Sequence, residues 1–317
     1  MTIQLAASAR ALTTPTPVDV NDTSIVPDTL TTAWIGVDLS AFGADSGLAM
    51  NLAQELPIER VNVRRLEAGV QAAHKGGLDF VSLGCSFHTR SDYRIRDCTL
   101  DATNMVAELA EHSTGGIFAE VPAKARHINQ AIDLLAPQSE GWAGITIAVD
   151  ENTSYKELAE SLKAARQAGV RIAVLLSDAQ ISHELAENIA QVADVVRLRI
   201  TDPHSARETR FMIRAAAQAH GRELPVLAEL GIVISASLQA AEERSVLISE
   251  MMGVQLFEGM ASTIGTVYDV ADTIESWVGL GAADGVVLIP ASLPTDLASI
   301  LRGVIPLLQE RTALDQK

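Results

Sequence analysis

Polar and charged residues follow each apolar segment of this chain that could form a strand. In sequence order they are Asp38 and Ser40; Cys85, Ser86 and His88; Glu120; Asp150 and Glu151; Ser177 and Asp178; Thr201 and Asp202; Glu229; and Ser292. Carboxylates and imidazoles can move protons, and hydroxyls can hold a ligand by hydrogen bonds. Asp, Ser and Thr are also preferred helix caps, so capping is the alternative role for each one taken singly. As a ring, these residues predict a ligand site wherever the segment ends converge.

Strand-like and helix-like segments alternate along the chain from residue 33 onward. The expected strands cover residues 34–37, 80–83, 116–121, 144–149, 171–176, 195–200, 225–230 and 286–289. The expected helices cover residues 62–75, 100–112, 123–136, 154–168, 181–192, 205–219, 235–252 and 267–279, with a closing helix to about residue 311. Short, wholly apolar strands are typical of a parallel sheet that is covered on both faces.

Eight such strands separated by helices predict a (β/α)8 TIM barrel. An open doubly wound sheet shows the same alternation and is the alternative. No Gly-x-Gly-x-x-Gly follows the first strand, which favours the barrel. In a barrel, the loops after the strands build the site at the C-terminal ends of the strands. Residues 253–263 are expected to form a longer connection.

Three helix starts carry the spacing of a capping box. They are Thr266 with Asp269, Ser154 with Glu157, and Ser205 with Glu208. In this motif the first side chain accepts a backbone N–H of the first turn, and the acidic side chain accepts the N–H of the capping residue. The spacing therefore predicts helices that begin at these three places.

Composition limits the classes of partner and compartment. The net charge is −16, which repels nucleic-acid phosphates and anionic membrane surfaces. The two cysteines have no metal-ligand spacing and no disulfide framework, as expected for a cytoplasmic protein. No apolar run is long enough to span a membrane. Residues 1–32, rich in Thr, Pro, Asp and Asn, predict an extended or disordered arm before a single barrel domain at 33–317.

Three stretches carry a family resemblance. The first runs from Gly265-Thr266 through an amphipathic helix with Trp277 to Gly281-Ala-Ala-Asp-Gly285, an apolar strand and Leu293-Pro294. The second begins at Gly77-Leu-Asp-Phe-Val, and the third covers residues 139–150. Together they resemble the bacterial luciferase-like flavin-dependent monooxygenases, in particular the branch with nitrilotriacetate-type oxygenases.

The resemblance implies a luciferase-like barrel that holds reduced FMN, or a deazaflavin in some branches, at its mouth. It also implies a small organic substrate, a partner flavin reductase and a homodimer formed through the helices at 100–112 and 123–136. The flavin carries the oxygen chemistry, and the protein supplies position, polarity and water exclusion. The implied flavin neighbours are Asp38, Ser86, Thr146, Ser177, Asp178, Ser182 and His183, and the implied catalytic residues are His88, Glu120 and Glu229.

The chain departs from the family at the expected phosphate site. The family has Gly-Arg before the helix that follows the fifth strand, whereas this chain has Ser182 and His183 before Glu184-Leu-Ala. The long insertion after the fourth strand is also absent. Two other readings therefore stay open. One is a non-catalytic barrel that serves as a binding or structural subunit with no flavin. The other is a barrel enzyme for another small ligand, with Glu120, Glu229 and Asp178 as acid–base groups.

The acidic and histidine side chains show no spacing that favours a metal ion. His88 has an alternative reading as a surface residue at the start of a charged run, Arg90, Asp92, Arg94 and Arg96, that is expected to form a solvated lid.

Overall fold

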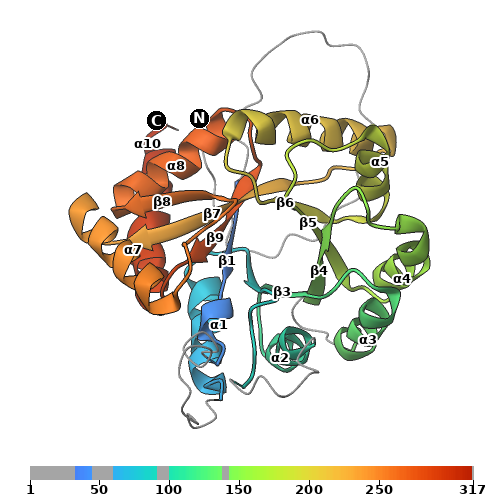
Figure 1. The fold of residues 1–317 in the computed structure, drawn as a ribbon, viewed down its shortest axis with the longest axis horizontal. Coiled ribbons are helices and arrows are strands. Elements are labelled where there is room, and N and C mark those ends of the chain that lie inside the picture. The colour runs from blue at the N-terminus through green and yellow to red at the C-terminus, as the bar shows by residue number, and fades with distance from the viewer. Residues whose placement is uncertain (1–32, 45–59, 91–99, 138–142, 316–317) are drawn as a thin grey trace.

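A computed structural model describes residues 33–44, 60–90, 100–137 and 143–315 (Figure 1). The strands are β1 Trp34–Asp38, β2 Phe80–Leu83, β3 Gly116–Glu120, β4 Ala143–Val149, β5 Arg171–Leu176, β6 Val195–Leu198, β7 Val226–Ile234, β8 Ala261–Gly265 and β9 Gly285–Pro290. The arm expected at 1–32, the lid residues after Arg90, and residues 139–142 of the third family stretch lie outside the described residues.

Helices follow almost every strand and surround the sheet in Figure 1. They are α1 Val63–Lys75, α2 Asp101–Ala110, α3 Ala125–Leu135, α4 Tyr155–Gln167, α5 His183–Val192, α6 Pro203–Ala219, α7 Leu238–Met252, α8 Val267–Gly279, α9 Thr295–Ser299 and α10 Ile305–Asp315. A 3-10 turn, Ser40–Phe42, follows β1, and a π-helical turn, Ile300–Val304, joins α9 to α10.

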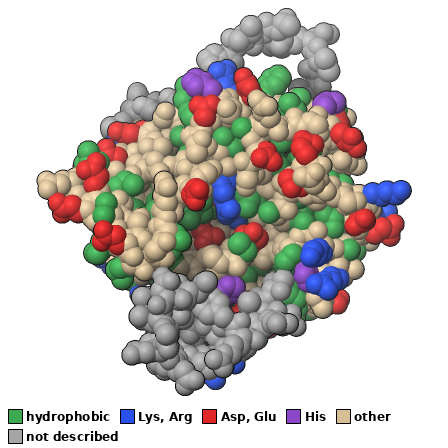
Figure 2. Space-filling model, in the orientation of Figure 1, with side chains coloured by type: hydrophobic (Ala, Val, Ile, Leu, Met, Phe, Trp, Pro, Cys, Tyr) green, Lys and Arg blue, Asp and Glu red, His purple; other side chains and the backbone are tan. Residues whose placement is uncertain are grey.

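The sheet closes on itself. Each strand from β1 to β7 pairs in parallel with the next, β7 pairs with β9, and β9 pairs with β1. This ring of eight parallel strands confirms the (β/α)8 barrel and excludes the open sheet. Figure 2, in the same orientation, shows a basic side chain with acidic side chains beside it near the middle of this face, over the barrel.

The connection expected at 253–263 is wrong in part, because it ends in the strand β8. β7 extends to Ile234, beyond the predicted end at residue 230, and its last five residues pair with β8. One edge of β7 thus pairs with β6 in its N-terminal part and with β8 in its C-terminal part. Its sequence, Ala-Ser-Thr-Ile-Gly, has no continuous apolar run, so the pattern that marks the other strands is missing.

One of the three expected capping boxes forms. Thr266 Oγ1 accepts the Asp269 N–H, and Asp269 accepts the Thr266 N–H at the start of α8. Ser154 makes no side-chain cap, and α6 begins earlier than expected, with Asp202 as its cap and Pro203 in its first turn. A Pro at the first helical position favours that earlier start, because a backbone N–H at this position would have no hydrogen-bond partner within the helix.

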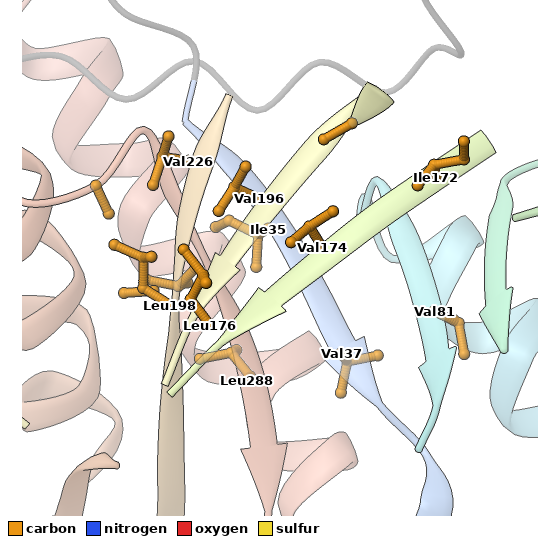
Figure 3. Packing of buried hydrophobic residues seen from close by; sticks show 14 of the residues in the cluster. Ile35, Val37, Val81, Ile172, Val174, Leu176, Val196, Leu198, Val226 and Leu288 are labelled. Atoms are coloured by element: carbon orange, nitrogen blue, oxygen red, sulfur yellow. The ribbon is translucent and has the colours of Figure 1, made fainter. Parts of the chain in front are cut away.

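Alternate residues of the strands face the helices or the barrel interior. Figure 3 shows the buried layer toward the helices, with Ile35, Val81, Val174, Leu198 and Leu288 among its labelled members. The interior holds a separate cluster at its N-terminal half, made of Phe80, Phe118, Ala173, Val195, Leu227 and Val287. This apolar cluster fills the interior below the polar residues near the C-terminal ends of the strands, which include Asp38, Glu120 and Glu229.

Three aspartates close the N-terminal end of the barrel in the same way. Asp79, Asp194 and Asp284 stand just before β2, β6 and β9, and each accepts the N–H of a neighbouring strand: Ile35 (2.7 Å), Ile172 (3.0 Å) and Val226 (2.9 Å). Each aspartate also donates its own backbone N–H to the carbonyl of the residue whose N–H it accepts. In the Gly-Leu-Asp and Ala-Ala-Asp parts of the family resemblance, the aspartates therefore join neighbouring strands at the end of the barrel opposite the expected site.

Candidate functional site

A hydrogen-bonded group joins the C-terminal ends of β1 and β2. Asp38, 9% exposed, accepts the Ser82 hydroxyl at 2.7 Å and the Ser40 N–H at 2.9 Å. The Ser40 hydroxyl in turn accepts the Gly84 N–H at 2.6 Å. Both oxygens of the Asp38 carboxylate are thus oriented by the chain before any ligand arrives.

Glu120 extends this group from β3. Its Oε2 accepts the Cys85 N–H at 3.1 Å. A methyl group added to Gly84 would stand 3.2 Å from Ser40 Oγ, 3.4 Å from Glu120 Oε2 and 3.5 Å from Asp38 Oδ2. Gly84 therefore leaves a hollow of methyl size among these oxygens, which we call the Gly84 cradle. A ligand N–H donor would fit such a hollow, because its oxygens are acceptors.

The interior on the opposite side carries a buried ion cluster. Glu229 on β7 is fully buried, and its two oxygens lie 2.6 Å from Arg197 Nη2 and 2.6 Å from Arg199 Nε. The Arg197 side chain is 4% exposed, and that of Arg199 is 32% exposed. Arg199 is thus the cation of this cluster that reaches the mouth.

The strand sequence could have revealed both arginines. Val195-Val-Arg-Leu-Arg-Ile200 places Arg197 and Arg199 two residues apart, hence on one face of a strand that must be covered on both sides. Because a buried guanidinium requires a carboxylate partner, this spacing predicts an interior ion pair. The apolar character of the segment alone predicts the strand but not the two arginines.

The electrostatics of the mouth follow from this arrangement. Burial alone would lower the pKa of the Arg199 guanidinium, but the charge and hydrogen bond of Glu229, with help from Glu120, raise it above its usual value. Desolvation raises the pKa of the Cys85 thiol to about 11, and the charge of Glu120 adds to the effect. At neutral pH the mouth therefore holds a guanidinium and a neutral thiol.

Thr146 faces the interior beside this group. It is fully buried on β4 and lies in register with Glu120 on β3. Its hydroxyl finds no hydrogen-bond partner among the described residues. A buried hydroxyl without a partner costs free energy. A ligand that formed a hydrogen bond with the Thr146 hydroxyl would remove this cost and so bind more tightly.

The predicted residues at the fifth strand lie apart from this interior group. Ser177 and Asp178 are exposed in the loop after β5, and His183 has a side-chain exposure of 81%. Ser182 caps α5 through the Leu185 N–H. The Glu151 carboxylate accepts the Ser182 N–H at 2.6 Å and the Ser182 hydroxyl at 2.9 Å. A carboxylate of the chain therefore stands at the helix N-terminus that was expected to hold a phosphate.

The two remaining predicted residues follow β2. Ser86 is exposed in the turn, and His88 is partly buried, with its carbonyl accepting the Ala44 N–H at 2.8 Å. The ring Nδ1 of His88 is buried and has no hydrogen-bond partner among the described residues. Across the described ranges no three acidic, His or Cys side chains group to hold a metal ion. In those same ranges, the helices are too short or too polar to traverse a bilayer.

The reactivity of the Cys85 thiol tests whether Cys85 and Glu120 lie together beside the Gly84 cradle. With its pKa near 11, we expect Cys85 in a Cys98→Ser background to react with iodoacetamide about tenfold more slowly at pH 8 than an ordinary thiol, because the smaller thiolate fraction outweighs its higher nucleophilicity. The pH–rate profile should bend near 11, and Glu120→Gln should move the bend to lower pH. A bend near pH 9 with Glu120 unchanged would show that the Cys85 thiol is hydrated and is not raised by the charge of Glu120.

Comparisons with solved structures give the same architecture. No family model and no curated relative matches the chain. The EDTA monooxygenase EmoA from Chelativorans sp. BNC1 is 13% identical with a TM-score of 0.64, over 88% of this chain and 94% of that one. The long-chain alkane monooxygenase LadA is 13% identical with a TM-score of 0.64, over 88% and 91%. Riboflavin lyase RcaE, solved with modified FMN and the substrate riboflavin, is 14% identical with a TM-score of 0.65, over 88% and 92%.

These likenesses confirm the luciferase-like barrel that the sequence resemblance implied. At such identities they establish the fold, and the ligand and the reaction must be argued from the site.

Proposed function

We propose that this chain is a flavin-dependent oxidoreductase of the luciferase-like monooxygenase kind, with the flavin ring at the C-terminal mouth of the barrel and a small organic substrate beside it. The observation that carries the proposal is the Gly84 cradle, where oriented oxygens of Asp38, Ser40 and Glu120 surround a hollow inside this fold. When bound, a reduced flavin would supply electrons for the activation of oxygen.

The ring end of a flavin fits the residues present. A flavin ring has a polar edge with one N–H donor and several acceptors, and its remaining surface is apolar. The Gly84 cradle offers acceptors, while the Arg199 guanidinium and the Thr146 hydroxyl offer donors. The apolar interior cluster below them excludes water from the far side of the site. These residues would bind and orient the ring, and Arg199 would favour negative charge on it.

The phosphate end does not fit at the start of α5. Glu151 already occupies the Ser182 N–H and hydroxyl, and a second anion there would face its charge. No guanidinium is placed there by the sequence, since the family Gly-Arg is replaced. A flavin with an uncharged tail is therefore favoured over FMN, and a deazaflavin with a phosphorylated tail would meet the same carboxylate.

Neutralising Glu151 is expected to change tail preference. Glu151→Gln keeps a side-chain oxygen for the Ser182 N–H but removes the charge, so FMN affinity should rise about fivefold, a Coulomb effect of about 1 kcal/mol, while riboflavin affinity stays within about twofold. Parallel fluorescence titrations with both flavins measure the ratio. Glu160→Gln, an exposed carboxylate on α4, is the matched control and should leave the ratio unchanged. An unaltered FMN affinity in Glu151→Gln would place the tail elsewhere.

The proposed function is tested by the reoxidation of reduced flavin. Photoreduced riboflavin is mixed with aerated buffer in a stopped-flow spectrometer at increasing protein concentration. A protein that holds reduced flavin in a desolvated mouth should change the reoxidation rate in a saturable way. Traces identical to those of free flavin at every protein concentration would overturn the proposal.

A partner reductase and the homodimer stay predictions. Five apolar residues of α2 and α3, the helices expected at a dimer contact, are already buried within the single chain: Met105, Val106, Leu109, Ile128 and Leu135.

A further inference from the structure

The interior face of β7 carries a glycine in its C-terminal half. Leu227 packs in the interior cluster, Glu229 pairs with the interior Arg197, and Gly231 continues this alternation toward the C-terminal end. Gly231 is in register with Ile289 of β9, another residue of the interior face. Gly231 therefore faces the barrel interior two residues nearer the mouth than Glu229.

The ring of Phe257 covers Gly231. A Cβ at position 231 would overlap the Cγ, Cδ1 and Cδ2 atoms of Phe257, so only glycine leaves room for the ring. Phe257 comes from the segment between α7 and β8, and that segment reaches the barrel where the Ala261 N–H bonds to the Ile200 carbonyl at 3.2 Å. The ring thus lies on the interior side of β7, at the level of the mouth, and it is only partly buried.

The backbone of Phe257 is in an unfavourable conformation for its side chain. Its φ is 58°, and it is the one residue other than glycine with a positive φ in the described part of the chain. Two glycines of the same segment, Gly253 and Gly259, adopt similar values without a steric cost. A phenylalanine in this region is strained, because its Cβ lies too close to the following carbonyl oxygen, and such residues gather at binding sites.

The surroundings of the ring define what it could bind. The oxygens of Asp38 and Glu120 project from β1 and β3, and the Arg199 guanidinium projects from β6 beside β7. A partly exposed aromatic face next to a polar rim suits a planar ring that is apolar on its faces and polar at its edge.

We propose that Phe257 is the residue on which the flavin ring stacks, and that Gly231 is required to let its side chain lie in the mouth. This inference rests on the proposed function and assigns a position to the ring within that site. Phe257 is a specificity-determining residue for planar ligands, and the strain in its backbone is retained because the loop holds the aromatic ring in place for that contact.

The test uses lumiflavin, which has the flavin ring without the ribityl tail. Phe257→Leu keeps apolar bulk and removes the aromatic face, so lumiflavin and riboflavin should both bind about five- to tenfold more weakly, while Phe257→Tyr binds as the parent does. Phe211→Ala, a phenylalanine change at a 75% exposed position on α6, is the control and should change neither affinity.

Phe257→Gly separates binding from stability. Glycine removes the backbone strain, so its melting temperature should fall less than that of Phe257→Ala, although both variants should lose ring binding. Parent-like affinity in Phe257→Leu and Phe257→Gly, with flavin still bound by the parent protein, would overturn the stacking role and leave the proposed function intact. If the parent binds neither lumiflavin nor riboflavin, the proposed function itself fails, and this inference with it.

Discussion

Glu229→Gln is expected to lower the free energy of unfolding by about 3–5 kcal/mol, because it removes one partner of a buried ion cluster. Arg197 and Arg199 each lie 2.6 Å from a Glu229 oxygen, and neither Arg197 nor Glu229 has appreciable contact with solvent. A neutral amide of the same size leaves the buried Arg197 guanidinium without a counter-charge, whereas Arg199 keeps its contact with solvent and the charge of Glu120. Urea denaturation followed by circular dichroism measures the loss.

The double variant Glu229→Gln with Arg197→Met is the control for this cluster. Methionine fills much of the volume of the buried arginine and removes its charge, so the double variant should recover about half of the lost stability. Recovery of this kind identifies the unpaired charge, rather than altered packing, as the cause. A loss below about 1 kcal/mol in Glu229→Gln alone would show that the cluster is hydrated and that the interior is open to water.

Asp79→Asn is expected to stabilise the protein at neutral pH. Burial raises the pKa of the Asp79 carboxyl to about 6 from 3.8, against a smaller opposing effect of the Ile35 N–H bond. Since the folded state then holds this proton more tightly than the unfolded state, the contribution of Asp79 to stability is greatest below pH 3.8 and is lost as the pH rises through about 6. An asparagine in its place stays neutral and can still accept the Ile35 N–H.

The measurement compares urea unfolding of the two proteins from pH 4.5 to 7.5. Asp79→Asn should exceed the parent by about 2 kcal/mol at pH 7.5, after allowance for partial solvent screening, and the difference should shrink toward pH 4.5. Asp133→Asn, an exposed position on α3, is the control and should give a difference near zero throughout. A difference at Asp79 that is independent of pH would mean that its carboxyl titrates alike in both states.

The architecture could be predicted from the sequence because apolar strands and amphipathic helices alternate with little interruption. The exceptions have physical reasons. β8 pairs only with the end of β7 and needs no long apolar run, so Ala261–Gly265 resembled a connection. Ser154 stands at the start of α4 as predicted but makes no side-chain cap. Ser205 lies inside α6, because Asp202 and Pro203 begin that helix earlier.

The candidate site was predicted in part. Asp38, Glu120 and Glu229 follow from their places near the ends of strands, and Thr146 follows from the family resemblance. The structure directs all four to the barrel interior. The contacts that distinguish this barrel could not be predicted, because they join residues distant in the sequence. Glu151 meets Ser182 across two loops, and Phe257 meets Gly231 from a segment with no periodic pattern.

The most direct test of the central claim is an equilibrium dialysis of riboflavin against the parent protein and Gly84→Leu. The leucine side chain is larger than the methyl-sized hollow between Ser40, Glu120 and Asp38, so it would block the hollow completely, and the backbone at Gly84 has no positive φ to forbid the substitution. We expect one riboflavin per parent chain, and at least about tenfold weaker binding in Gly84→Leu with an unchanged circular dichroism spectrum. Equal binding by both proteins, or no saturation of the parent up to about 1 mM riboflavin, would contradict a flavin site at this mouth.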